Sequence, residues 1–163
     1  MVIINLIGSR KKIPFTQKDL TFIVKTFHKI ADKKIEIDLP LTIDCCLVSR
    51  KKIIQLNEKW RGKSQSATIL AFPDYYLKQK GEPVRGEIHL GDLIIAPEVI
   101  RSKAKENFGE SNLKNFRLQF INSFIHSLAH LYGYTHNSIK NILKMEKVEK
   151  QIKEIVIKKL IRS

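Results

Sequence analysis

The chain has 163 residues, of which 43% are hydrophobic and 28% charged, and its formal net charge at pH 7 is +14. This length predicts a single domain over residues 1–163, and no apolar run approaches the ~18 residues of a membrane-spanning helix. The strong basic charge favours a polyanionic partner such as nucleic acid over a merely solvated lysine-rich surface.

Cysteine usage and the N-terminal segment indicate a cellular location. The two cysteines, Cys45 and Cys46, are adjacent, and neighbouring residues on a strand point to opposite faces, so we expect no disulfide between them. That fits a reducing cytoplasm. Residues 2–7 are apolar, but no basic region precedes them and no small-residue cleavage site follows. They predict a first strand rather than a signal peptide, and we expect a cytoplasmic protein.

Hydrophobic periodicity predicts the main elements in chain order. Short apolar runs predict four strands, over residues 2–7, 41–48, 68–72 and 88–95. Helical spacing predicts five helices, beginning at about residues 17, 50, 97, 113 and 138. Thr16 and Ser49 can serve as N-caps, and Gly62 can end the second helix. Pro73 is expected to stop the third strand, and the polar residues 74–86 to form a loop.

The order of these elements indicates the fold class. Strands and helices interleave in the first hundred residues, and helices dominate the rest. This order predicts an α/β (α+β) fold with a single mixed β-sheet of about four strands and about five helices packed on it.

Three of the five histidines lie within eleven residues, in the sequence HSLAHLYGYTH. His126 and His130 are spaced i, i+4, so a helix places both imidazoles on one face. Gly133 permits a positive-φ turn that can bring His136 back as a third ligand. Three nitrogen ligands leave a fourth tetrahedral position for water, as in catalytic zinc sites. The sequence therefore predicts a metal site at His126, His130 and His136.

The same histidine spacing occurs in metzincin proteases, HExxHxxGxxH. Those enzymes need Glu directly after the first His as the general base. Here the residue is Ser127, which cannot accept a proton near neutral pH. A metzincin-like metalloprotease is therefore an alternative that Ser127 disfavours.

Four motifs, in order, resemble the YbeY family of metal-dependent single-strand endoribonucleases, also described as rRNA maturation factors. The histidine segment is similar to the family's HxxLHLxGYDH, with Thr135 where Asp is usual. LNEKWRGKSQSATILAFP (56–73) is similar to LNxxYRxxxxxTDVLSFP, LGDLII (90–95) to LGDIVI, and MEKVE (145–149) to an acidic MExxE. The resemblance covers most of residues 50–150.

The resemblance implies a set of catalytic residues. The three histidines of the family hold one metal, generally zinc, so we expect one Zn²⁺ per chain at His126, His130 and His136, with another divalent transition metal as the alternative. Arg61, in KWRGK, matches a functional arginine of the family. An arginine near a metal can hold a scissile phosphate bidentately and offset its growing charge, so Arg61 joins the histidines as an expected catalytic residue.

The sequence departs from the family where TDVLSFP is usual. Thr68 replaces the usual Asp and Ala71 the usual Ser. Losing a residue that orients a metal ligand typically weakens metal binding ~10–100-fold. Thr68 and Asp92 are the candidates to support the ligands. Asp92 can receive an imidazole N–H, or can instead cap a turn.

The resemblance implies hydrolysis of single-stranded RNA, in small-subunit rRNA 3′-end processing and ribosome quality control. The expected partners are single-stranded RNA, rRNA and the small ribosomal subunit, without a membrane or DNA. The basic surface would hold the RNA backbone independently of sequence. Its candidate contacts are Lys51, Lys52, Lys59, Lys63 and Arg85. Besides the metalloprotease, a non-catalytic RNA-binding assembly factor with a structural metal is the other alternative.

Overall fold

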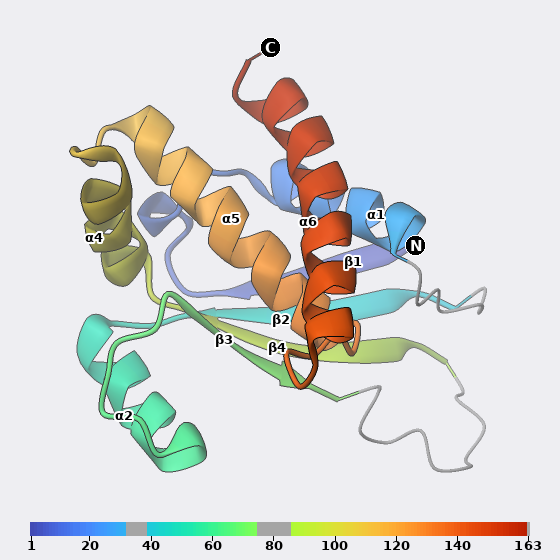
Figure 1. Ribbon diagram of the computed structural model, residues 1–163, viewed down its shortest axis with the longest axis horizontal. Helices are drawn as coiled ribbons and strands as arrows, with labels where there is room; N and C mark the ends of the chain where they lie inside the picture. The colour runs from blue at the N-terminus through green and yellow to red at the C-terminus, as the bar shows by residue number, and fades with distance from the viewer. Residues whose placement is uncertain (32–38, 75–85, 163) are drawn as a thin grey trace.

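A computed structural model describes residues 1–31, 39–74 and 86–162 (Figure 1). One four-stranded sheet runs through it in the spatial order β1-β2-β4-β3. Its strands are β1 (Val2–Ile7), β2 (Leu41–Leu47), β3 (Ile69–Pro73) and β4 (Ile88–Ile95). β1, β2 and β4 are parallel, whereas β3 pairs antiparallel with β4 at one edge. The expected mixed sheet is therefore confirmed.

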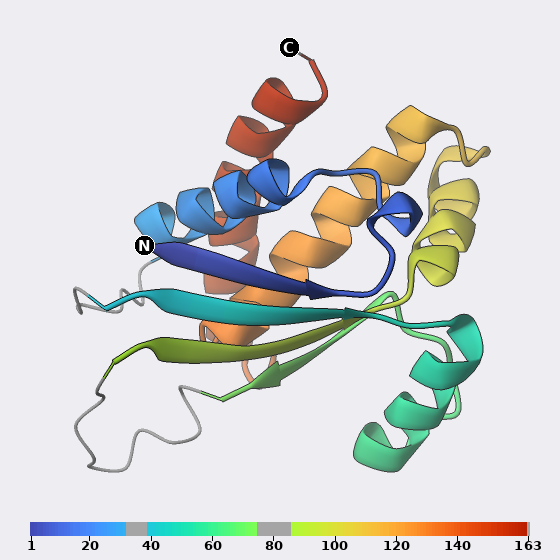
Figure 2. The ribbon, with the colours of Figure 1, turned by 180° about the vertical axis from the view of Figure 1, so that it is seen from behind.

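Five α-helices accompany the sheet within the described residues. They are α1 (Gln17–Ile30), α2 (Arg50–Arg61), α4 (Pro97–Phe108), α5 (Leu113–Leu131) and α6 (Ile139–Leu160), and a short 3-10 turn, η1, spans Arg10–Lys12. Figures 1 and 2 show α1, α5 and α6 over one face of the sheet, whereas α2 lies on the opposite side near one end. No described helix is long and apolar enough to cross a bilayer.

The core lies between the sheet and the helices of the first face. α5 contributes Phe116, Phe120 and Phe124 at helical spacing, and all three are fully buried. Burying one such side chain stabilises the fold by roughly 1.5–3 kcal/mol. α5 packs on β3 and β4 and is itself flanked by α4, α6 and α1. This central position makes α5 a rigid support for side chains at its C-terminal end.

The expected helix signals are present in the structure. Thr16 accepts from the Asp19 N–H while Asp19 accepts from the Thr16 N–H, which forms the capping box. Ser49 caps α2, and Gly62 ends it in the left-handed region at φ 65°. The third strand differs slightly from expectation, because Pro73 is its last residue rather than its stop. β3 is an edge strand, where a missing N–H is tolerated.

A β-bulge in β4 changes which residues face together. Ile43 of β2 pairs with Gly91 while its neighbour Thr42 pairs with His89, so Leu90 is the extra residue. Gly91 has φ 139°, and a Cβ there would lie 2.1 Å from the carbonyl oxygen of Phe72. Only glycine fits this close approach of two strands.

Two further expectations concern the cysteines and the loop. Cys45 is buried and Cys46 is half-buried, and both are free thiols, as expected for neighbours on opposite faces of a strand. Burial raises the pKa of the Cys45 thiol to about 12, assisted by the charges of Cys46 and nearby aspartates. Residues 75–85 of the expected loop, including Arg85, lie outside the described residues.

Candidate metal centre

The end of α5 brings the three histidines together. His126 and His130 lie one turn apart on the helix, and their ring centroids are 4.8 Å apart. The chain then turns through Gly133, whose φ is 79°. His136 follows this turn, with ring centroids 5.2 Å from His126 and 5.0 Å from His130. One ligand atom from each histidine lies within 4.8 Å of the other two.

A Schellman motif fixes the turn that returns His136. The Tyr134 N–H donates to the carbonyl oxygen of Ala129 at 3.0 Å, and the Gly133 N–H to that of His130 at 3.0 Å. This pair of bonds requires a left-handed residue after the helix end, which glycine adopts without strain. The motif also directs the Tyr134 carbonyl oxygen at His130 Nδ1, 3.1 Å away.

Glu149 of α6 holds the first histidine. Its Oε1 lies 2.8 Å from His126 Nδ1, and its Oε2 lies 3.0 Å from Lys153 Nζ. The residue is only 8% exposed. Burial alone would raise the pKa of Glu149, but the hydrogen bonds from His126 and Lys153 outweigh it and hold that pKa below its usual value. The carboxylate therefore stays charged and accepts the Nδ1 hydrogen of His126.

The surroundings of the second histidine favour its neutral form. Burial lowers the pKa of His130, and the nearby charge of His126 lowers it further, although the hydrogen bond to Tyr134 acts in the opposite direction. A carbonyl oxygen only accepts, so the Nδ1 of His130 carries the hydrogen in this bond. With Nδ1 protonated, the Nε2 of a neutral imidazole presents a lone pair.

The two Nε2 atoms fit a shared cation. His126 Nε2 and His130 Nε2 are 3.3 Å apart. When both Nδ1 atoms carry the hydrogens of neutral rings, two lone pairs face each other across this gap. Tetrahedral zinc with ~2.0–2.1 Å bonds to nitrogen separates its ligands by ~3.3 Å. The donor set therefore fits Zn²⁺, and a carboxylate and a carbonyl support two ligands from behind, as in carboxylate–histidine–zinc sites.

Arg61 lies at the C-terminal end of α2, within electrostatic reach of the histidines. Its positive charge is among the causes that lower the pKa of His130. Gly62 ends the helix directly after it, and Asn57 Nδ2 donates to the carbonyl oxygen of Gln65 at 2.8 Å, which ties the following loop back to α2. Arg61 itself is exposed and makes no hydrogen bond or ion pair within the described residues. Its guanidinium is available to a ligand.

A polar cavity of about 250 Å³ opens beside the first histidine. Its lining residues are Thr68, Ile69, Gln119, Asn122, Ser123, His126, Ser127, Glu149 and Lys153. Thr68, a candidate to support the ligands, thus shares a cavity with His126, although no hydrogen bond joins the two side chains in the described structure. Ser127 is 4% exposed and lines the same hollow.

Asp92, the other candidate, does not support any of the three histidines in this structure. Because of the bulge in β4, Asp92 lies on the same face as His89, and its Oδ1 is 3.1 Å from His89 Nε2. Together with Asp44 the pair forms a separate group of close donor atoms on the sheet. Asn5 donates to Asp44 at 2.7 Å, so this group is already hydrogen-bonded.

Four of the five candidate RNA contacts lie on α2 or just after it. Lys51, Lys52, Lys59 and Lys63 are all exposed, on α2 or just after it. Lys59 and Lys63 flank Arg61 in the sequence. Lys51 and Lys52 belong to the first turn of α2, about 14–15 Å from Arg61 along the helix axis at ~1.5 Å per residue. The fifth candidate, Arg85, lies outside the described residues.

Glu149 is the functional residue that sequence reasoning left without a role. The acidic motif MEKVE is visible in the sequence, but the contact of Glu149 with His126 is not. A signal was present, because Glu149 lies between Met145 and Ile152 on the buried stripe of α6. A carboxylate on the apolar side of a helix is rarely buried unless it is paired.

Comparisons with known proteins identify the family of this chain. A family model described as "Endoribonuclease YbeY" matches residues 6–156. A protein named "Endoribonuclease YbeY" from Bartonella henselae is 35% identical over 117 residues, 72% of this chain and 65% of its own length. One from Thermodesulfovibrio yellowstonii is 34% identical over 149 residues, 90% of this chain and 87% of its own.

The fold also has a counterpart among solved structures. The solution structure of a protein from Thermotoga maritima is 25% identical, with a TM-score of 0.56, and the match covers 96% of this chain and 90% of that one. The family model spans nearly the whole chain and includes the three histidines and Arg61. The chain therefore belongs to the YbeY endoribonuclease family.

Proposed function

We propose that the chain is a metal-dependent endoribonuclease that hydrolyses phosphodiester bonds in single-stranded RNA, with zinc as its metal. The pair of Nε2 atoms of His126 and His130, 3.3 Å apart with both Nδ1 atoms already engaged, carries the proposal. Membership of the family and the names of its relatives support the reaction class.

Each residue of the centre has a chemical task. When bound, zinc supplies Lewis acidity toward a phosphoryl oxygen and lowers the pKa of a bound water toward ~7. Glu149 and the Tyr134 carbonyl fix the imidazoles with Nε2 facing the centre. Arg61, exposed and without an ion pair in the described part of the chain, can bind two phosphate oxygens at once and offset the charge that grows during cleavage.

Glu149 is a positioning residue rather than the general base. Both of its carboxylate oxygens are engaged, one by His126 and the other by Lys153. A carboxylate with a depressed pKa is also a poor proton acceptor near neutral pH. The centre thus differs from that of a metzincin, in which a Glu beside the first histidine is free to act on water.

We further propose that the substrate is rRNA, processed at the 3′ end of the small-subunit RNA in the cytoplasm and in ribosome quality control. The support is the role that the resemblance to the family implies, together with the net charge of +14. Lys59 and Lys63, which flank Arg61, are better placed to hold the RNA backbone than Lys51 and Lys52. Their contribution would be sequence-independent and salt-sensitive.

The decisive experiment compares cleavage with metal content. Purified protein is expected to contain about one zinc per chain and to cut a labelled single-stranded RNA, and a chelator should stop the cutting. Arg61→Ala should lower kcat/KM by about 100-fold, the scale of losing one charge-stabilising group. Arg61→Lys keeps the charge but not the bidentate fork, so we expect it to recover only part of that loss.

The outcome also separates the alternatives. If wild type and Arg61→Ala bind RNA equally and neither cuts it, the protein is a binding factor with a structural metal. Chelator-sensitive digestion of casein would instead support a metalloprotease. A folded protein that carries no metal and still cuts RNA would refute the role of the histidines.

A further inference from the structure

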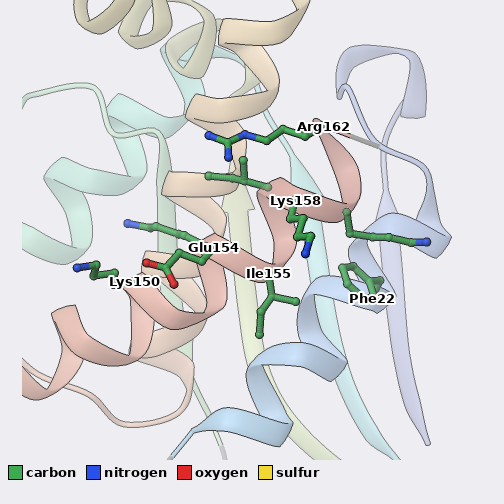
Figure 3. A pocket seen from close by; sticks show the side chains of 9 residues that line it. Phe22, Lys150, Glu154, Ile155, Lys158 and Arg162 are labelled. Carbon is green, nitrogen blue, oxygen red and sulfur yellow. The ribbon is translucent and has the colours of Figure 1, made fainter.

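Three neighbouring surface hollows share lining residues, and the first of them lies beside His126 of the candidate metal centre. The cavity beside His126 includes Lys153. Lys153 also lines a larger hollow of about 1250 Å³ along α6. Figure 3 shows this hollow, with Lys150, Lys158 and Arg162 of its lining labelled. That hollow reaches Phe22 of α1, and Phe22 also lines a third hollow, of about 840 Å³. Each hollow thus shares one side chain with the next.

Positive charge dominates both outer hollows. The hollow on α6 is lined by five cations, Lys150, Lys153, Lys158, Lys159 and Arg162, against one carboxylate, Glu154. The hollow on α1 has three, Arg10, Lys18 and Lys25, and no acidic residue in its lining. We refer to these eight side chains as the basic track. Seven of them are exposed, and Lys153 is half-buried and paired with Glu149.

The fold does not need this concentration of charge. Lys158, Arg162 and Lys25 make no ion pair within the described residues. Like charges gathered on one surface repel one another and destabilise the folded state unless a polyanion neutralises them. An electropositive groove with an aromatic side chain in its path is how single-stranded nucleic acids are bound without sequence preference.

We propose that the basic track binds the backbone of single-stranded RNA on one side of the cleaved bond and leads the strand to the metal centre. This inference rests on the proposed nuclease function and adds a substrate path that lies on α6 and α1, away from the lysines of α2. Phe22, half-buried at the junction of the two outer hollows, offers a ring on which a base can stack. A flexible single strand can follow hollows on two helices, whereas a rigid duplex cannot.

The dimensions set the length of RNA to be tested. From Glu149 to Arg162 the chain advances 13 residues, about 20 Å at ~1.5 Å per helical residue. A stacked strand rises ~3.4 Å per nucleotide, so about six nucleotides span this part of the track. A strand of 20 nucleotides therefore reaches the track from the centre with length to spare.

The test measures binding of the metal-loaded full chain to a fluorescent 20-nucleotide single strand of 2′-O-methyl RNA, which resists hydrolysis, over a range of salt concentrations. Lys158→Gln/Arg162→Gln removes two charges from the track. Lys105→Gln/Lys114→Gln removes two exposed charges on α4 and α5, outside all three hollows, and is the matched control. Loss of two phosphate contacts should reduce the slope of log K against log salt by ~1.4 and weaken binding about tenfold near 100 mM salt.

Two further measurements separate charge from stacking and binding from catalysis. Phe22→Leu keeps an apolar side chain against the core but removes the ring, so affinity should fall about fivefold with an unchanged salt slope. On a cleavable 20-nucleotide RNA, the track variant should raise KM and leave kcat unchanged. A duplex of the same length should bind more weakly than the single strand.

The outcomes separate a failure of the basic track from a failure of the proposed nuclease function. If the control weakens binding as much as the track variant, or the track variant leaves the salt slope unchanged, the track is refuted even though the protein cuts RNA. Equal binding of the duplex would also refute it. If the track variant alone weakens binding but the wild type never cuts RNA, the track stands and the nuclease proposal fails.

Discussion

Replacing Glu149 by Gln tests the metal centre without touching a proposed ligand. Glu149 is 8% exposed and accepts hydrogen bonds from both His126 Nδ1 and Lys153 Nζ. Gln has nearly the same shape but only one accepting oxygen. If that oxygen keeps the bond to His126, the NH₂ group must face the lysine ammonium, so two donors oppose each other in a buried place.

The expected loss of zinc affinity follows from these lost hydrogen bonds. Removing a residue that orients a metal ligand typically weakens metal binding ~10–100-fold, which corresponds to about 1.4–2.7 kcal/mol. Because both oxygens of Glu149 are engaged, we expect a value in the upper half of that range. Zinc affinity can be measured by competition with a chromophoric chelator, and unfolding in urea without metal shows whether the fold itself is weakened.

The matched control is Glu146→Gln, one turn earlier on the same helix. Glu146 is exposed and makes no hydrogen bond or ion pair in the described structure, so zinc affinity should stay within about twofold of wild type. If Glu149→Gln also stays within twofold while His130→Ala abolishes zinc binding, the carboxylate does not orient His126, and the support assigned to α6 is wrong.

Three other predictions concern the pH dependence of zinc affinity, two glycines with positive φ, and the reactivity of the thiols. Burial and neighbouring charge lower the pKa of His130 below the usual histidine value near 6.5. Protons should therefore not compete with zinc for His130 until the pH falls below that value. A titration of zinc affinity should show no loss from this residue between pH 8 and 7. Gly91→Ala should destabilise the fold in urea by at least ~3 kcal/mol, because φ is 139° and the new Cβ would meet a backbone oxygen at 2.1 Å. Gly62→Ala, at φ 65° with nothing within 4 Å, should cost only about 1 kcal/mol. Cys45, with its pKa raised to about 12, should resist a thiol reagent until the protein unfolds. Cys46 is partly exposed and should react in the native state, but slowly, because burial and the nearby aspartates raise its pKa too.

The histidine cluster was predictable because its geometry is local. An i, i+4 pair on a long apolar helix and a glycine three residues later determine where three imidazoles lie, and the structure reproduces this arrangement. Glu149 is different, since it reaches His126 only when α6 packs against α5. The sequence shows that Glu149 lies on the apolar side of α6. It does not show which helix that side packs against.

The placement of Asp92 shows how one backbone irregularity defeats a sequence pattern. Period-two alternation puts His89 and Asp92, three residues apart, on opposite faces of a strand. The extra residue at Leu90 shifts the register by one, so both lie on the same face and bond to each other. Gly91 was a signal for such a bulge, yet an interior glycine alone does not tell which side chains will be redirected.

Thr68 has a different significance once the centre is known. The family's usual aspartate is missing there, yet the two ligand histidines on α5 already have acceptors, Glu149 for His126 and the Tyr134 carbonyl for His130. Neither support depends on position 68. A threonine in the cavity instead leaves Glu149 as the only carboxylate in its lining, and Lys153 pairs with it. A neutral wall repels a phosphate less than an acidic one does, so under the proposed function Thr68 would ease the approach of the RNA backbone but would not supply a proton acceptor.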